Sequence, residues 1–158
     1  MFRKMRRAHQ QMTDVQVEEI LKNADYGTLS VIGDGGYPYC VPLNFVYYNG
    51  NIYFHCAKAG HKVDAIKENS KVCFNIVSEQ KVIEEKYTTY YKSVTAFGNA
   101  RIVDNEKLKI EAVTALAKKY VSFGDEEIKK EIDTALKALC IIEFDIEHVT
   151  GKEYKPQK

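Results

Sequence analysis

The sequence of 158 residues contains no tryptophan and only three prolines, and it has no long run of apolar residues. A membrane-spanning helix needs about 20 consecutive, predominantly apolar residues. The first residues also lack the apolar stretch of a secretory signal peptide. We therefore expect a cytoplasmic protein that does not enter a membrane.

The sequence also lacks an excess of charge of either sign. It has 23 basic and 22 acidic residues and a net charge of +1, so no overall field would attract nucleic acid or an anionic membrane surface. Any anion site must be local. The one basic cluster comprises Arg3, Lys4, Arg6 and Arg7. Such terminal clusters are most often solvated, although an arginine here could fold back onto a phosphate or a partner subunit.

Closely spaced cysteines are missing too. The four cysteines, Cys40, Cys56, Cys73 and Cys140, are far apart and form no C-x-x-C pair, so we expect free thiols. A zinc site built from His55, Cys56 and His61 is disfavoured. Neighbouring strand residues point to opposite faces, and the sequence offers no fourth ligand at a suitable spacing. The sequence therefore predicts no metal site.

The chain reads as a single domain over residues 1–158, because 45% of its residues are hydrophobic and no linker rich in Pro, Gly or Ser divides it. We expect an N-terminal arm at 1–12 and a polar C-terminal tail at 148–158. Thr13-Asp14-Val15-Gln16 matches a helix capping box and predicts a helix that ends near Ala24. Apolar residues at helical spacing predict two more helices, at 105–120 and from Asp125 to about Leu139.

Six segments have strand character. They are 26–32, the two halves of a hairpin within 37–57, 71–77, 90–103 and 140–146. Gly98 interrupts the fifth segment and predicts a bulge or a sharp bend. Only one short helix separates the first five strands, which favours an antiparallel sheet or small barrel over a parallel sheet. The predicted fold is mainly β, of the α+β class, with flanking helices.

The hairpin turns at Asn49-Gly50, a pair suited to the positive φ angles of a type I′ turn. Counting outward predicts the cross-strand pairs Tyr48–Asn51, Phe45–Phe54, Asn44–His55, Leu43–Cys56 and Pro42–Ala57. Alternation then assigns Phe45, Phe54, Leu43 and Cys56 to a core face, and places Asn44 beside His55 on the other face. That second face would suit a planar ligand. The alternative is an edge pair whose polar groups bond to each other.

A short amphipathic helix is predicted after Gly60, since Val63 and Ile66 are three residues apart. Free backbone N–H groups at a helix start, a flexible glycine and the cation of Lys62 together make a plausible anion site. The alternative is that Lys62 extends into solvent.

Four motifs in this order resemble a known family: VPLNF at 41–45, FHCA at 54–57, Gly60-His61-Lys62, and the long TTYYKSVTAFGNARIV strand. The chain resembles the split-barrel flavoproteins related to pyridoxamine 5'-phosphate oxidase, and within them it is most similar to the nitroimidazole-resistance proteins. The resemblance extends from Met5-Arg6-Arg7 to the DIEHVTGKE segment. It implies a six-stranded antiparallel split β-barrel.

The resemblance further implies a homodimer with two FMN sites at the subunit interface. Val41, Pro42, Leu43 and Asn44 would lie along the flavin ring, His55, Cys56 and Ala57 would border it, and His61 and Lys62 would hold the phosphate. Tyr91 and Ser93 would reach the ring from the second subunit. The oxidase branch typically has an Arg-Lys pair at the phosphate helix and a C-terminal segment with arginine and tryptophan. His61-Lys62 and the missing tryptophan favour the drug-resistance-like branch.

These expectations lead to two main hypotheses. The first is an FMN-dependent oxidoreductase that reduces a small planar acceptor such as a nitroaromatic, with His55 as the proton donor because imidazole titrates near neutral pH. The second is a dimeric module that binds flavin or haem without catalysis. A third reading, a purely structural dimer in which the cations near Gly60 meet a partner carboxylate, remains open at this point.

Overall fold

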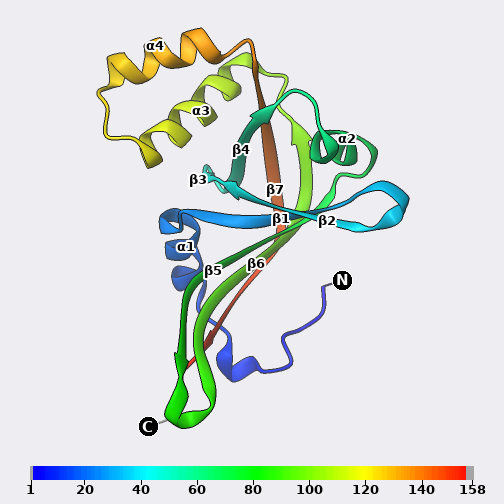
Figure 1. Ribbon diagram of the computed structural model, residues 1–158, viewed down its shortest axis with the longest axis vertical. Helices are drawn as coiled ribbons and strands as arrows, with labels where there is room; N and C mark the ends of the chain where they lie inside the picture. The colour runs from blue at the N-terminus through cyan, green and yellow to red at the C-terminus, as the bar shows by residue number, and fades with distance from the viewer. Residues whose placement is uncertain (1, 156–158) are drawn as a thin grey trace.

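The computed structural model describes residues 2–155 and shows one curled, antiparallel sheet of seven strands (Figure 1). In spatial order the strands run β2-β1-β5-β6-β7-β4-β3. Their bounds are β1 Tyr26–Ile32, β2 Pro38–Asn44, β3 Val46–Tyr48, β4 Asn51–Ala57, β5 Lys71–Ile83, β6 Thr88–Ile102 and β7 Leu139–Tyr154. The α-helices are α1 Asp14–Asn23, α2 His61–Glu68, α3 Glu106–Tyr120 and α4 Asp125–Ala135. No helix within the described residues is long and apolar enough to span a membrane.

The sheet has seven strands rather than the expected six, because the first half of the predicted hairpin is two strands. The pair Tyr48–Asn51 is confirmed, but β3 pairs with β4 only as far as Val46–Tyr53. The residues before Phe45 form β2, which pairs with β1 at the opposite edge of the curled sheet. The predicted pairs from Phe45–Phe54 to Pro42–Ala57 are therefore wrong. The curled sheet is a half-barrel, and Phe45 connects its two edge strands, β2 and β3. The strand that was expected to be continuous is therefore interrupted at Phe45.

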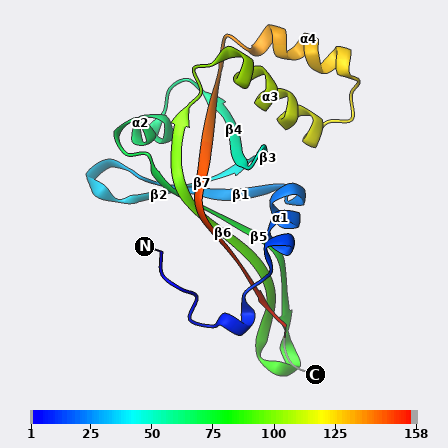
Figure 2. The same cartoon turned by 180° about the vertical axis from the view of Figure 1, so that it is seen from behind.

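Strands β5, β6 and β7 continue beyond the barrel as a narrow three-stranded ribbon, seen at the lower end of Figures 1 and 2. β7 runs to Tyr154, so residues 148–154 of the predicted polar tail are a strand that pairs with β6, and residues 156–158 of that tail lie outside the described residues. The bulge predicted at Gly98 is confirmed by a register shift between Phe97 and Gly98. A Cβ at Gly98 would collide with the backbone of Asp145, which explains the glycine.

Two apolar clusters fill the molecule. One lies inside the barrel and contains the fully buried phenylalanines Phe45, Phe54, Phe74 and Phe144. The other lies outside the barrel, where α3 and α4 cover Val46, Tyr53 and Ile141. The hairpin face predicted to meet a ligand is thus partly buried under these helices.

The capping box predicted for the first helix is confirmed, whereas α4 ends at Ala135 and the predicted helix end at Leu139 is the start of β7. Thr13 and Gln16 form the capping box of α1, with the Thr13 N–H donating to Gln16 Oε1 at 2.9 Å and the Gln16 N–H donating to Thr13 Oγ1 at 3.3 Å. The segment ahead of α1 lies against the sheet rather than extending away from it. Gln11 bridges to Lys152, and the Phe2 ring stacks on His148 at 4.6 Å.

Candidate functional site

Strand β2 forms one edge of the sheet. Its side chains alternate between the core and the outer face, as in any strand. Val41 and Leu43 pack against the interior cluster, whereas Pro42 and Asn44 are exposed on the outer face. The Asn44 amide donates to the Asp25 carbonyl at 3.0 Å and does not pair with His55. A flat ligand on this face could contact the side chains of Pro42 and Asn44, but Val41 and Leu43 only through their backbone.

The end of β4 also divides between two faces. His55 and Ala57 are exposed, while Cys56 turns toward the barrel interior. Burial, with a smaller contribution from the neighbouring Cys140, raises the pKa of the Cys56 thiol to about 11, although the charge of Lys62 offsets part of this effect. Cys56 is therefore a neutral packing thiol. All four cysteines are free, as predicted.

The start of α2 retains the features of an anion site. Gly60 has φ 132°, a conformation that L side chains rarely adopt, and an added Cβ there would meet nothing within 4 Å. The N–H groups of Val63 and Asp64 donate to the Gly60 carbonyl, so those of His61 and Lys62 remain at the open end. Within residues 2–155, Lys62 has no carboxylate partner. These donors fit a phosphate group.

His61 has partners of its own. Its Nε2 accepts a hydrogen bond from the Asp34 N–H at 3.3 Å, and its ring stacks on Tyr39 with 4.2 Å between centroids. These contacts hold the start of α2 against the β1–β2 turn and leave Nδ1 as the free ring nitrogen. The structure thus brings the first turn of α2, strand β2 and the end of β4 together.

Tyr91 and Ser93 are not brought to this place within one chain. They lie on the outer face of β6, and strands β1 and β5 separate β6 from β2 in the sheet. Tyr91 pairs with Tyr154 near the far part of the ribbon. Any contribution from Tyr91 or Ser93 to a site at β2 would have to come from another copy of the chain.

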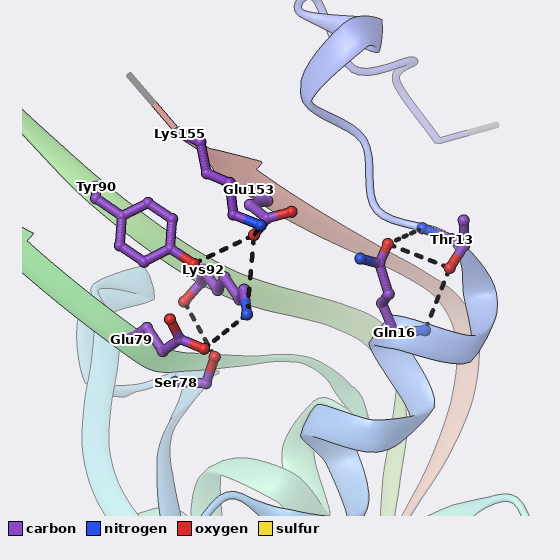
Figure 3. A network of polar contacts seen from close by, with 8 residues as sticks. All are labelled: Thr13, Gln16, Ser78, Glu79, Tyr90, Lys92, Glu153 and Lys155. Carbon is purple, nitrogen blue, oxygen red and sulfur yellow. Dashed lines mark hydrogen bonds and ion pairs between the residues drawn. The ribbon is translucent and has the colours of Figure 1, made fainter. Parts of the chain in front are cut away.

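The ribbon beside these two residues is held by a charged network (Figure 3). Lys92 Nζ lies 2.7 Å from Glu79 and 3.8 Å from Glu153, and the Tyr90 hydroxyl donates to Glu153 at 3.2 Å. The hydrogen bond to Glu79 raises the pKa of Lys92 to about 12. Every ionised group in this network has an opposite charge beside it, so we assign it a structural role.

Sequence reasoning missed two residues at the strand break. The Tyr120 hydroxyl accepts from the Phe45 N–H at 3.0 Å and lies 2.8 Å from the Phe45 carbonyl. Lys119 Nζ donates to the carbonyls of Ala24 at 2.7 Å and Phe45 at 3.0 Å, and it lies 3.9 Å from the centre of the Phe45 ring. The end of α3 thus satisfies the backbone that no strand pairs. A Lys-Tyr pair at a helix end carries no sequence signal for this role.

A cavity of about 740 Å³ lies where α3 and α4 cover the outer surface of β4. Asn44 and His55 both line it, so the two residues do share a site although they do not pair across strands. Within residues 2–155, no three histidine, cysteine or acidic side chains lie close enough together to hold a metal ion.

Comparison with known protein families identifies the family of this chain. The sequence matches the family described as pyridoxamine 5'-phosphate oxidase over residues 13–153, nearly the whole chain. The chain belongs to this family. The family resemblance drawn from the four sequence motifs is therefore confirmed. No curated protein sequence matches this family member significantly.

Solved structures show the same fold at low sequence identity. A proposed 5-nitroimidazole antibiotic resistance protein from Bacteroides thetaiotaomicron is 22% identical, with a TM-score of 0.76 over 90% of this chain and 86% of that one. A conserved hypothetical protein from Mycobacterium tuberculosis is 16% identical, with a TM-score of 0.85 over 98% and 96%. A FAD and heme binding protein from Mycobacterium smegmatis is 15% identical, with a TM-score of 0.70 over 93% and 74%.

Proposed function

We propose that this family member is an FMN-binding flavoprotein and an oxidoreductase that reduces small planar acceptors such as nitroaromatics. The observation that carries the proposal is the cation of Lys62 at the open start of α2, beside the exposed outer faces of β2 and β4. A cofactor with a phosphate and a flat ring matches both parts at once. Flavin-binding proteins among the structural neighbours support the same choice.

Different residues of this chain would bind the phosphate, orient the ring and donate the proton. Lys62 and the free N–H groups at the start of α2 bind the phosphate, and the outer side of β2 with Pro42 and Asn44 orients the ring. A bound flavin would supply the electron transfer. His55, exposed at the end of β4, would hold a proton for the acceptor, since imidazole exchanges protons near neutral pH.

The proposal includes a homodimer, because the outer face of the sheet is suited to contact with a second copy of the chain. Its central residues bear no acidic, lysine or arginine side chain and include the exposed Ile32 and Phe97. They are Thr28, Ser30, Ile32, Pro38, Cys40, Pro42, Cys73, Asn75, Thr95, Phe97, His148 and Thr150. Protein interfaces are depleted of charge at their centres in this way. A second copy on this face would bring Tyr91 and Ser93 toward the partner's β2.

Flavin reoxidation tests the enzymatic part of the proposal. The purified protein is loaded with FMN, reduced without oxygen and mixed with a nitroimidazole, and the return of flavin absorbance is followed. We expect reoxidation faster than that of free reduced FMN under the same conditions. Equal rates would reject the oxidoreductase function while leaving flavin binding intact.

The second candidate function is a dimeric module that holds flavin or haem without turnover. The similarity in fold to a FAD and heme binding protein favours including it. The visible spectrum of the purified protein separates flavin from haem. A colourless protein that gains no thermal stability from FMN would contradict both candidates, because ligand at 100 times its dissociation constant should stabilise the folded state by about 2.7 kcal/mol.

A further inference from the structure

The cavity under α3 and α4 has the size and lining of a small-molecule site. Its volume of about 740 Å³ lies within the range of about 300 to 1,000 Å³ that ligand pockets occupy. It meets the proposed flavin strands only through Asn44 and His55. Most of its wall is therefore free to hold something other than the cofactor.

The wall is apolar and stays partly open to solvent. Its buried part comes from the outer core cluster and comprises Val113, Leu116, Ile128 and Ile132. The last residue of α3 and the segment after it add Tyr120, Val121 and Phe123, which are 37%, 40% and 68% exposed. Three exposed, largely apolar residues within four positions at the mouth of a cavity favour a ligand that would cover them.

The charges on the wall all have one sign. Among the described residues that line the cavity, the carboxylates are Glu127 and Glu131, one turn apart on α4, and there is no lysine or arginine. Glu127 Oε2 already accepts from the Gly124 N–H at 2.7 Å. Glu131 has no hydrogen bond or ion pair with residues 2–155. Apart from a proton held by His55, an anionic ligand would meet only negative charge here.

We propose that this cavity receives the second reactant of the flavin site and selects planar aromatic molecules that are neutral or cationic over anionic ones. The inference rests on the proposed function, because His55 and Asn44 join the cavity to the strands assigned to the flavin ring. The apolar wall binds the ring system of the reactant, and Glu131 sets the charge preference. Phosphorylated and carboxylated substrates are disfavoured.

Binding of two matched fluorescent probes tests the charge preference without any turnover. N-phenylnaphthylamine is neutral, and anilinonaphthalenesulfonate has the same ring skeleton with an added sulfonate. We expect the protein to bind the neutral probe about tenfold more tightly than the anionic one, because the sulfonate would lie near Glu131. Equal affinity for the two probes, or binding of neither, would overturn the inference.

Charge reversal at one position assigns the preference to the cavity. Glu131→Lys should abolish or reverse the preference, and Glu131→Gln should give an intermediate value. Glu126→Lys makes the same charge change on α4, at a residue that does not line the cavity, and should keep the wild-type preference. If Glu131→Lys and Glu126→Lys behave alike, the preference does not come from this cavity.

The affinity for FMN, measured by quenching of flavin fluorescence, is determined for the same variants. It distinguishes the two proposals: unchanged FMN binding without probe selectivity rejects only the cavity inference. Selective probe binding in a protein that does not bind FMN rejects only the proposed function. Phe123→Asp adds a check on the alternative occupant. If it dissociates a dimer, a second copy covers the mouth and the inference is wrong.

Discussion

Two lysines of this chain show how the surroundings of a side chain decide its role. Lys62 stands at the start of α2 with no carboxylate partner among the described residues, so its charge is available to a ligand. Lys119 is half-buried and bound to the carbonyls of Ala24 and Phe45. Burial lowers the pKa of Lys119 to about 8, and the charge of Asp25 offsets part of this effect. The first lysine is suited to binding and the second to holding the fold.

Lys62→Ala should weaken FMN binding by about 1.5 to 3 kcal/mol, the usual contribution of a hydrogen bond to a charged group. Flavin fluorescence quenching measures the dissociation constant. Lys67→Ala is the matched control, since Lys67 lies on the same helix but near its other end, 3.9 Å from Asp64. Equal losses in the two variants would show that general charge, and not the site at Gly60, attracts the cofactor.

His55→Ala should leave the dissociation constant for FMN unchanged and slow flavin reoxidation by the nitroaromatic about 100-fold or more, the range for loss of a positioned proton donor. His9→Ala removes an exposed histidine ahead of α1, outside the proposed site and the proposed dimer face, and serves as the control. An unaltered rate in His55→Ala would remove its proposed role.

Lys119→Met should change how stability depends on pH. The pKa of Lys119 is about 8 in the folded protein and about 10.5 when unfolded, so between these values the unfolded state binds more protons. The free energy of unfolding should therefore rise in the wild type, relative to Lys119→Met, as the pH increases from 8 to 10. Urea unfolding of both proteins measures the difference. Groups with raised pKa values, such as Tyr53 and Cys56, act in both proteins and cancel.

At the scale of elements, Glu143 joins three strands outside the barrel. It lies on β7 with 5% of its side chain exposed, and it accepts from Tyr53 on β4 at 2.8 Å and from Arg101 Nε on β6 at 2.6 Å. Burial raises the pKa of Glu143, but hydrogen bonds from Tyr53, Arg101 and Asn51 outweigh it and keep the pKa below its ordinary value. The carboxylate is thus charged at neutral pH and ties β4 to the sheet below the helices.

Tyr53→Phe should lower the free energy of unfolding by about 1.5 to 3 kcal/mol, because it removes a buried hydrogen bond to a charged group. Chemical denaturation gives the value directly. Tyr48→Phe removes a hydroxyl that has no hydrogen-bond partner among residues 2–155 and should change stability little. If both variants are equally stable, Glu143 does not contribute to holding β4 in place.

At the scale of the whole molecule, the uncharged outer face of the sheet bears on both the proposed dimer and the proposed cofactor site. The residues predicted to complete the site, Tyr91 and Ser93, lie on this face but are separated from β2 by two strands. A second copy placed against the same face would bring both sets together. The dimer would then be needed for cofactor binding as well as for covering apolar surface.

Phe97→Asp should therefore give a monomer and weaken FMN binding at the same time, since a buried charge in the centre of an interface is costly. Light scattering gives the mass, and flavin fluorescence gives the affinity. Phe123→Asp makes the same change at an exposed position away from this face and should keep the dimer. A Phe97→Asp protein that binds FMN normally as a monomer would contradict the shared site.

The features that the sequence alone determined are local ones. The capping box of α1, the Asn49-Gly50 turn, the helical spacing after Gly60 and the bulge at Gly98 depend on neighbouring residues and on backbone conformation. Family membership also follows from the sequence, because the motifs keep their order along the chain.

Only the tertiary structure decided the pairings between distant segments. The strand break at Phe45 exists because the two edges of a curled sheet meet there and α3 supplies Lys119 and Tyr120 to the unpaired backbone. The same long-range packing extends β7 to Tyr154, into the predicted tail, and places a cavity over His55. Register and enclosure depend on which surfaces are buried together. The alternation of side chains along a strand is the same whichever strand it pairs with, so the alternation does not identify the partner.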